Sequence, residues 1–180
     1  MKLRSLLLSI AVMLLAMPGS AQTPLIADLS EHQIQITTGF VGTDVLLFGT
    51  VDPNSDVVVV IRGPEEETTV WRKGRYGGVW INDRRVAFQR VPSFYAVRSS
   101  APLHAVASDV TRARDGMGAE FLRLGSVDEG VGEAELNDFR KALIRNKERQ
   151  GLFATSGDEI AFLGGQLFRT RLHFPANVPT

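Results

Sequence analysis

Short apolar segments alternate with turn-forming residues along the chain from position 33 to position 97. β-Branched and aromatic side chains predominate within each segment, and glycine, proline, asparagine and aspartate separate the segments. This pattern is typical of successive short strands. The predicted strands are Gln33–Thr38, Asp44–Gly49, Asp56–Arg62, Thr68–Trp71, Gly78–Asn82, Val86–Arg90 and Phe94–Val97. Because no helical pattern separates them, they favour an antiparallel sandwich over a sheet of alternating strands and helices.

Two of these predicted strands differ in their pattern of polar and apolar residues. Ile34 and Ile36 alternate with polar residues, which is typical of a strand with one face in water. The run Val57–Ile61 is instead apolar at every position, as expected of a central strand that is covered on both faces. We therefore expect this run to anchor the core. The segment Asp52–Asp56, which carries Pro53 and Asn54, predicts a turn before it.

Beyond Pro102 the apolar positions recur with a helical period. One amphipathic helix is predicted by Leu103, Val106, Ala107, Val110 and Ala113, and it should end before Gly116. A second helix is predicted from about Glu133 to Gln150, with Gly151 as its stop and with Leu136, Phe139, Leu143 and Ile144 toward the core. Residues 128–132 form an acidic loop between the two. The region from about 103 to 150 is therefore expected to be a helical insertion between strands.

Strands return near the end of the chain. Glu159–Leu163 and Leu167–Phe174 are predicted to form a hairpin across Gly164 and Gly165. The predicted fold class is thus mainly β: an immunoglobulin-like antiparallel sandwich of about eight or nine strands with a helical insertion. A closed barrel is the alternative.

The last segment, Pro175–Thr180, is predicted to be a proline-bounded loop. A sandwich normally closes with an inner strand, so we expect that the last strand or strands are missing and that the chain is a truncated form of a longer anchored protein. An unpaired sheet edge favours association. Such a truncated form is expected to be marginally stable or oligomeric.

The first 21 residues have the pattern of a signal peptide. Met1–Arg4 is basic, Leu6–Met17 is apolar apart from one serine, and Gly19 and Ala21 are the small residues of a cleavage site. An uncleaved anchor is the alternative, but the apolar run is short of the ~20 residues that span a bilayer. We expect cleavage after Ala21 and export, which in a Gram-negative host means the periplasm, facing or attached to the inner membrane.

The composition of the chain restricts the number of domains and the classes of function. A chain of 180 residues corresponds to about one domain, so residues 22–180 are predicted to form a single one. The 20 basic and 20 acidic residues balance, so no global charge predicts nucleic-acid binding. Cysteine is absent, which excludes disulfides, thiolate nucleophiles and cysteine-ligated metal sites.

The motifs that would predict an enzyme are not found. His32, His104 and His173 lack the spacing of a metal site. Asp52, Asn54 and Asp56 have the spacing that opens a calcium loop, but Val57 and Gly63 stand where that loop needs glycine and a carboxylate, which favours a plain turn. There is no G-x-S-x-G nucleophile motif and no phosphate-binding loop. We therefore predict no catalytic, cofactor-binding or metal-binding residue, and a protein that is not an enzyme.

One local bias is cationic. Between positions 62 and 98 the only acidic residues are Glu65, Glu66, Glu67 and Asp83, and aromatic residues interleave with the basic ones. Guanidinium groups bind oxyanions through two hydrogen bonds and stack on indole rings. The candidate patch for a small oxyanion, a phospholipid head group or an acidic partner comprises Arg62, Trp71, Arg72, Lys73, Arg75, Trp80, Arg84 and Arg85. The alternative is a solvated hairpin whose arginines pair with an exposed tip, Glu65–Glu67, and whose tryptophans are in the core.

Five separated segments resemble a known family. They are residues 36–40 (ITTGF), 46–49 (LLFG), 56–64 (DVVVVIRGP), 91–97 (VPSFYAV) and 174–179 (FPANVP). In the same order, such segments occur in an uncharacterised alphaproteobacterial transmembrane protein family. The resemblance implies a signal peptide, a periplasmic β-rich domain and a C-terminal membrane helix, and we expect that the last of these belongs to the part missing after Thr180. It carries over no catalytic residue.

Two functions follow as expectations. The first is a non-enzymatic periplasmic accessory or interaction domain of a normally membrane-anchored protein; its partner would be a permease-type membrane protein, because genes of the resembled family lie near sulfite-exporter-type permeases. The alternative is a soluble periplasmic binder of a small oxyanion, such as sulfite or a sulfonate, through the arginine-rich hairpin. Neither expectation involves a cofactor or a nucleic acid.

Overall fold

The computed structural model describes residues 25–128, 130–155 and 160–178. Strands make up 44% and helices 21% of them, which confirms the mainly β class. The strands are β1 (Ile26–Leu29), β2 (Gly42–Thr50), β3 (Val58–Arg62), β4 (Glu65–Tyr76), β5 (Val79–Pro92), β6 (Tyr95–Ser99), β7 (Gly125–Ser126), β8 (Phe153–Ala154), β9 (Ala161–Leu163) and β10 (Leu167–Pro175). The helices are α2 (Leu103–Val106), α3 (Asp109–Asp115), α4 (Glu133–Arg149) and the 3₁₀ turn η1 (Ala119–Phe121).

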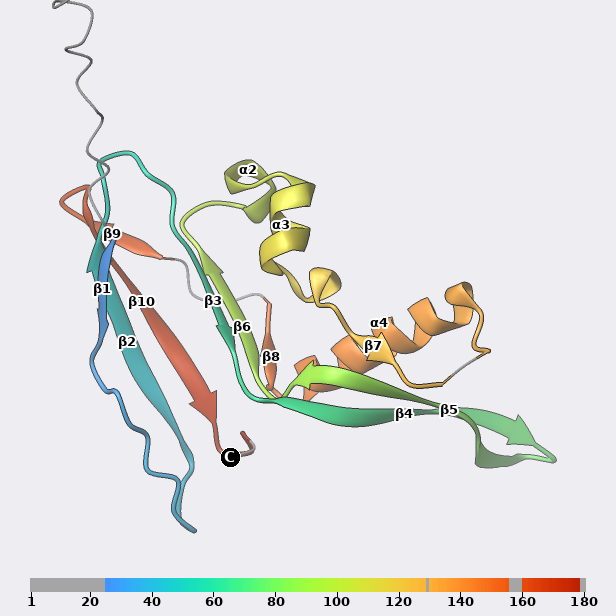
Figure 1. Ribbon diagram of the computed structural model, residues 1–180. Coiled ribbons are helices and arrows are strands. Elements are labelled where there is room, and N and C mark those ends of the chain that lie inside the picture. Colours follow the sequence, from blue (N-terminus) through green and yellow to red (C-terminus); the bar gives the residue numbers. More distant parts are fainter. Residues whose placement is uncertain (1–24, 129, 156–159, 179–180) are drawn as a thin grey trace, which may run out of the picture.

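These strands form three sheets. One has the order β1-β2-β10-β9, the second β3-β6-β8 and the third β4-β5-β7, and every pair is antiparallel except β6 with β8. Figure 1 shows the four-stranded sheet beside β3 and β6, while β4 and β5 project away from it below the helices. The immunoglobulin-like arrangement is not confirmed, since the strands divide into three sheets.

The second and third sheets are parts of one bent ribbon. β3 is followed directly by β4, and β5 directly by β6. At the bend, the Gly63 amide donates to the Phe94 carbonyl at 2.8 Å and the Ser93 amide donates to the Pro64 carbonyl at 2.8 Å. The backbone pairing therefore continues through the bend, and the long hairpin β4–β5 is an extension of β3–β6.

The core consists of two clusters, and β3 lies between them. The larger cluster contains Phe88, Tyr95, Phe139 and Leu143, and Val58 and Val60 of β3 pack against it. The smaller cluster contains Val57, Ile160 and Phe168, and Val59 packs against it. Because successive side chains of a strand point to opposite faces, the apolar run 57–61 serves both clusters.

The expected central position of this run is nevertheless wrong. In its sheet β3 is an edge strand that pairs only with β6, and its residues Val58–Ile61 are half-buried. The central strand is β6, in which Tyr95, Ala96, Val97 and Arg98 are all buried.

Several strand predictions need correction. Residues 33–38 do not form the predicted strand. The unpredicted strand β1 pairs instead with Leu47–Thr50 of β2. The predicted strands 78–82 and 86–90 are one strand, β5, and the hairpin turns at Gly77 and Gly78, whose φ values are +57° and +86°. Glu65–Glu67 are accordingly the first residues of β4 and not a hairpin tip. The hairpin of β9 and β10 across Gly164 and Gly165 is confirmed, although Glu159 lies outside the described residues.

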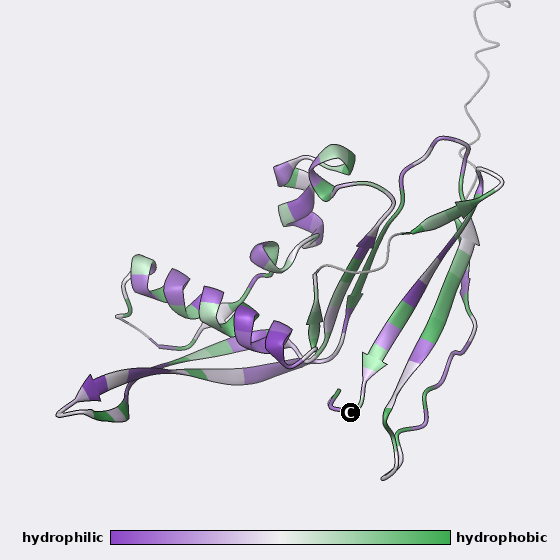
Figure 2. Ribbon diagram, turned by 180° about the vertical axis from the view of Figure 1, so that it is seen from behind, coloured by the Kyte–Doolittle hydropathy of each residue, from purple (hydrophilic) through white to green (hydrophobic). Residues whose placement is uncertain are grey.

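The first predicted helix is two short ones. The helix α2 ends at Val106, where Ala107 is extended. Ser108 then caps α3, because its side chain accepts a hydrogen bond from the Thr111 amide. Neither helix has a fully buried residue, and Val110 is 80% exposed, so of the expected apolar face only Leu103 packs against the larger core cluster. The helix α4 is confirmed, with Phe139 and Leu143 buried against the hairpin. Figure 2 shows α4 lying along β4 and β5, with hydrophilic and hydrophobic residues alternating along it.

Candidate functional site

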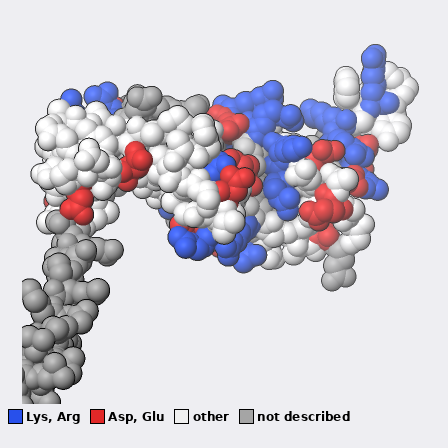
Figure 3. Space-filling view, turned by 90° about the horizontal axis from the view of Figure 1, so that it is seen from above, with Lys and Arg blue, Asp and Glu red and all other residues white. Residues whose placement is uncertain are grey.

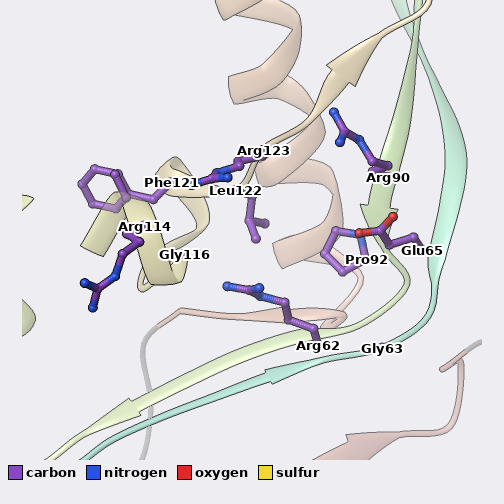
Figure 4. A pocket seen from close by; sticks show the side chains of 11 residues that line it. Arg62, Gly63, Glu65, Arg90, Pro92, Arg114, Gly116, Phe121, Leu122 and Arg123 are labelled. Carbon is purple, nitrogen blue, oxygen red and sulfur yellow. The ribbon is translucent and has the colours of Figure 1, made fainter. Parts of the chain in front are cut away.

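Four arginines surround a cleft of about 240 Å³ at the bend of the ribbon. Arg62 ends β3, Arg90 is in β5, Arg114 is in α3, and Arg123 follows η1. We call this cleft the arginine pocket. Its other lining residues are Gly63, Glu65, Pro92, Ala113, Gly116, Phe121 and Leu122. Figure 4 shows the Arg62 side chain extending from the ribbon toward Gly116 and Leu122. These two residues lie on the opposite wall of the cleft, together with Arg114 and Arg123.

The position of Arg62 depends on a glycine. Its Nη2 donates a hydrogen bond to the carbonyl of Asp115. A Cβ at Gly116 would lie only 2.2 Å from that nitrogen, and Gly116 has a φ of +62° as the left-handed residue that ends α3. Within the described part of the chain, no carboxylate lies within 4 Å of the Arg62 guanidinium. Its charge and most of its five N–H donors are thus available to a ligand.

Arg90 is oriented by a β-bulge. Glu66 pairs with Val91 and Thr68 pairs with Phe88, so Gln89 and Arg90 both lie opposite the single residue Glu67. Arg90 has a φ of +58°, a left-handed conformation that costs a non-glycine residue about 1–3 kcal/mol. Bulges of this kind redirect a side chain and are frequent at functional sites. The bulge is the one place in β5 where the chain holds such a conformation, and it places an arginine in the pocket.

The other two arginines differ in their pairing. Arg114 donates from Nε and Nη2 to the two carboxylate oxygens of Asp115, each at 2.8 Å. This pairing lowers the pKa of Asp115 and raises the pKa of Arg114. Arg123, by contrast, has no carboxylate within 4 Å among the residues that the structure describes. Arg114 is therefore the one pocket arginine whose charge is largely compensated.

Tyr95 fixes the wall of the pocket from inside the core. Its hydroxyl donates to the Gly116 carbonyl at 2.8 Å and accepts from the Gly118 amide at 2.7 Å. The side chain is fully buried, and this burial raises the pKa of the phenol above its usual value. The loop after α3 is thus held in one place by a buried hydrogen-bonding group at its centre.

The charge of the pocket suits a small anion. The lining contains four arginines and one carboxylate, Glu65, and the Asp115 carboxylate compensates Arg114, so the pocket keeps a net positive charge. Planar N–H donors from separate elements match the oxygens of a small oxyanion. Among the described residues, no group of three or more histidine, aspartate or glutamate side chains could hold a metal ion.

The predicted cationic patch does not form a single site. Of its eight residues only Arg62 lines the arginine pocket, and the other seven lie on the hairpin. Arg72 and Arg84 both bind the Glu135 carboxylate of α4, the former with an Nη1–Oε1 distance of 3.2 Å. They do not pair with Glu65–Glu67, contrary to the alternative interpretation. Trp71 and Trp80 are 50% and 64% exposed, so they are not core residues either.

Sequence reasoning missed three of the four pocket arginines as site residues. Arg90 belongs to the cationic stretch, but the sequence alone does not predict the bulge that distinguishes it from the other arginines there. Arg114 and Arg123 lie in the helical insertion, outside that stretch. Their one sequence signal is that they flank the glycines at 116 and 118, which predict a tight turn between two basic residues.

Comparison with known proteins gives one match. The family model described as "Putative transmembrane protein (Alph_Pro_TM)" matches residues 24–180. No curated protein and no solved structure matches the chain. Within the part of the chain that the structure describes, no helix is both long and apolar enough to cross a bilayer.

Proposed function

Since the chain belongs to the Alph_Pro_TM family of transmembrane proteins, we propose that it is the exported, non-enzymatic domain of a membrane-anchored protein and that its arginine pocket binds a small oxyanion. The observation that carries the proposal is a set of guanidinium groups around one cleft, those of Arg62, Arg90 and Arg123, with no carboxylate within 4 Å among the described residues. The basic and apolar pattern of residues 1–21 supports export.

The size and chemistry of the pocket limit the ligand. Its volume of about 240 Å³ is below the roughly 300–1,000 Å³ of pockets for drug-sized molecules. Its polar groups are hydrogen-bond donors apart from Glu65 and backbone carbonyls. Sulfate, sulfite, phosphate and small sulfonates fit this description, because each presents several acceptor oxygens on a compact anion.

Binding of an anion in the pocket also explains how the domain would act as an accessory to a membrane partner. Its walls belong to the bend of the ribbon on one side and to α3 and the loop after η1 on the other. An anion that accepts hydrogen bonds from both sides would hold them together. We propose that the domain presents this anion-dependent state to a permease-type membrane partner.

The thermal unfolding of the protein tests whether the arginine pocket binds these anions. A ligand that binds only the folded state stabilises it by RT ln(1 + [L]/Kd), about 2.7 kcal/mol at a hundredfold excess over Kd. We expect the melting temperature to rise with sulfate, sulfite, phosphate or methanesulfonate and not with chloride at equal ionic strength. Arg62→Gln and Arg123→Gln, each alone, should reduce the rise.

The matched control is Arg169→Gln, an exposed arginine of β10 on the four-stranded sheet, which should leave the rise unchanged. No rise with any oxyanion, or an equal loss in the control, would overturn the anion site. If the anions have no effect and the protein still co-purifies with a membrane permease, the accessory role stands without a ligand.

A further inference from the structure

The hairpin β4–β5 has one face covered by α4 and an opposite face that is largely exposed, although Trp71 and Lys73 of that face also border the cleft between β4 and α4. Residues directly opposite each other in an antiparallel pair point to the same side. Val70 pairs with Val86 and Arg72 pairs with Arg84, and on this side the two valines are buried and the two arginines bind Glu135 of α4. The other side carries the pairs Trp71 with Arg85, Lys73 with Asn82, and Arg75 with Trp80. We call this second side the cationic face.

The cationic face differs from the covered face in its charge. Among the residues that the structure describes, Lys73, Arg75 and Arg85 have no carboxylate within 4 Å. Arg85 lies 5.6 Å from the ring of Trp71, at the distance of a cation–π contact. Figure 3, which looks down on the helices, shows Lys and Arg side chains interspersed with Asp and Glu over the half of the molecule that the helices and the hairpin form. The hairpin face thus carries three uncompensated cations between two indole rings.

The end of the hairpin adds exposed apolar side chains. Val79 and Trp80 are each more than 60% exposed and Ile81 nearly half. In Figures 1 and 2 this end projects past α4 and touches no other element. Large apolar side chains on a projecting tip are costly in water and usually mark a contact with a protein or a membrane.

We propose that the cationic face and the tip of the β4–β5 hairpin dock on a bilayer that contains anionic phospholipids. Tryptophan rings partition to the level of the lipid head groups, and adjacent lysines and arginines are attracted by anionic lipid phosphates. A narrow projecting tip can enter this boundary without a complementary groove, which a protein partner would have to supply. This inference does not depend on the arginine pocket, since no residue of the face lines it.

Both tryptophans of the protein, Trp71 and Trp80, lie on the cationic face. Intrinsic fluorescence therefore reports this face alone and does not respond to the apolar segment at positions 6–17. With vesicles of phosphatidylcholine and phosphatidylglycerol, we expect a blue shift of the emission and quenching by lipids brominated near the head groups. With phosphatidylcholine alone, the emission should stay unchanged.

Variants test which residues are responsible. Lys73→Gln and Arg75→Gln should each weaken binding about fivefold, which corresponds to ~1 kcal/mol per cation. Trp80→Phe should keep part of the binding, whereas Trp80→Ala should lose more. The double variant Arg169→Gln/Arg171→Gln makes a similar charge change in the exposed part of β10 and should bind like the wild type.

Three results would overturn the proposal. They are unchanged emission with anionic vesicles, equal binding to neutral and anionic vesicles, and a loss in the β10 double variant equal to that in Lys73→Gln. If the emission responds to vesicles carrying membrane proteins and not to the same lipids alone, the partner is a protein and the lipid proposal is wrong. Circular dichroism of each variant separates loss of binding from loss of folding.

Discussion

At the scale of single residues, two glycines with nearly the same backbone conformation have different functions. Gly77 and Gly116 have φ values of +57° and +62°. A Cβ at Gly77 would meet nothing within 4 Å, whereas a Cβ at Gly116 would collide with the guanidinium of Arg62. The backbone conformation explains the choice of glycine at both positions, and the pocket requires it only at Gly116.

Gly116→Ala and Gly77→Ala therefore form a matched pair. Each substitution should destabilise the protein by ~1–2 kcal/mol, because the left-handed conformation is unfavourable for alanine. Only Gly116→Ala should also displace Arg62 and reduce the stabilisation by sulfate. Thermal unfolding with and without sulfate measures both effects. An equal response to sulfate in the two variants would show that Arg62 does not need this contact.

Tyr95 gives a second prediction at this scale. Tyr95→Phe leaves the Gly118 amide and the Gly116 carbonyl without their buried partner, so it should destabilise the protein by about 1–3 kcal/mol. Burial raises the pKa of Tyr95 in the folded state above its unfolded value. The folded protein thus holds this proton more tightly, and the associated stability is complete below pH ~10 and is lost as the pH rises through the folded pKa.

Chemical denaturation at a series of pH values checks this linkage. The wild type should lose stability above pH ~10 more steeply than Tyr95→Phe does. Tyr76→Phe is the control, because Tyr76 is 57% exposed. A variant Tyr95→Phe that follows the wild-type slope at high pH would contradict the assigned role.

At the scale of elements, α4 and the hairpin are joined by buried side chains, by the Lys147–Glu66 ion pair at 2.6 Å and by the carboxylate of Glu135. Phe139 and Leu143 of α4 pack with Val70 and Val86 of the hairpin. Near the projecting end, Glu135 binds Arg72 and Arg84, whose side chains are about half exposed. Exposed ion pairs each contribute little to global stability, about 0–1 kcal/mol. We therefore expect Glu135 to position the hairpin more than it stabilises the fold.

Glu135→Gln tests this positioning. It should change the free energy of unfolding by less than ~1 kcal/mol and should speed hydrogen exchange at the amides of residues 72–84. The control is Glu133→Gln, which removes the same charge from the same helix end at a residue that forms no ion pair within the described part of the chain. Similar exchange rates in the two variants would mean that the ion pairs do not restrain the hairpin.

At the scale of the whole molecule, β3 connects the two core clusters. Its alternate valines pack against the larger cluster on one face and the smaller cluster on the other. A defect in the smaller cluster should therefore weaken the entire fold and not one sheet alone. This coupling predicts a single cooperative unfolding transition.

Phe168→Ala tests the coupling. Phe168 is almost fully buried, so its truncation should cost about 3–5 kcal/mol. Tryptophan emission from the hairpin and circular dichroism of all strands should still give the same midpoint. Leu167→Ala, at an exposed neighbour in β10, should cost far less. Separate midpoints for the two probes would show that the four-stranded sheet unfolds by itself.

The sequence by itself determined the features that depend on local patterns: the mainly β class, the helix α4 with its end near Gly151, the hairpin at Gly164 and Gly165, and the family resemblance. Period, capping and turn chemistry act over a few residues, so they can be read directly. The tertiary structure alone decided which segment pairs with one edge of β2: it is Ile26–Leu29, and the alternating segment 33–38 is not a strand. It also decided the functional surfaces. The arginine pocket joins residues from five separate elements through a bulge and a bend, and the cationic face is largely exposed because α4 covers the opposite side. Both depend on contacts between residues far apart in the chain, which no local pattern specifies.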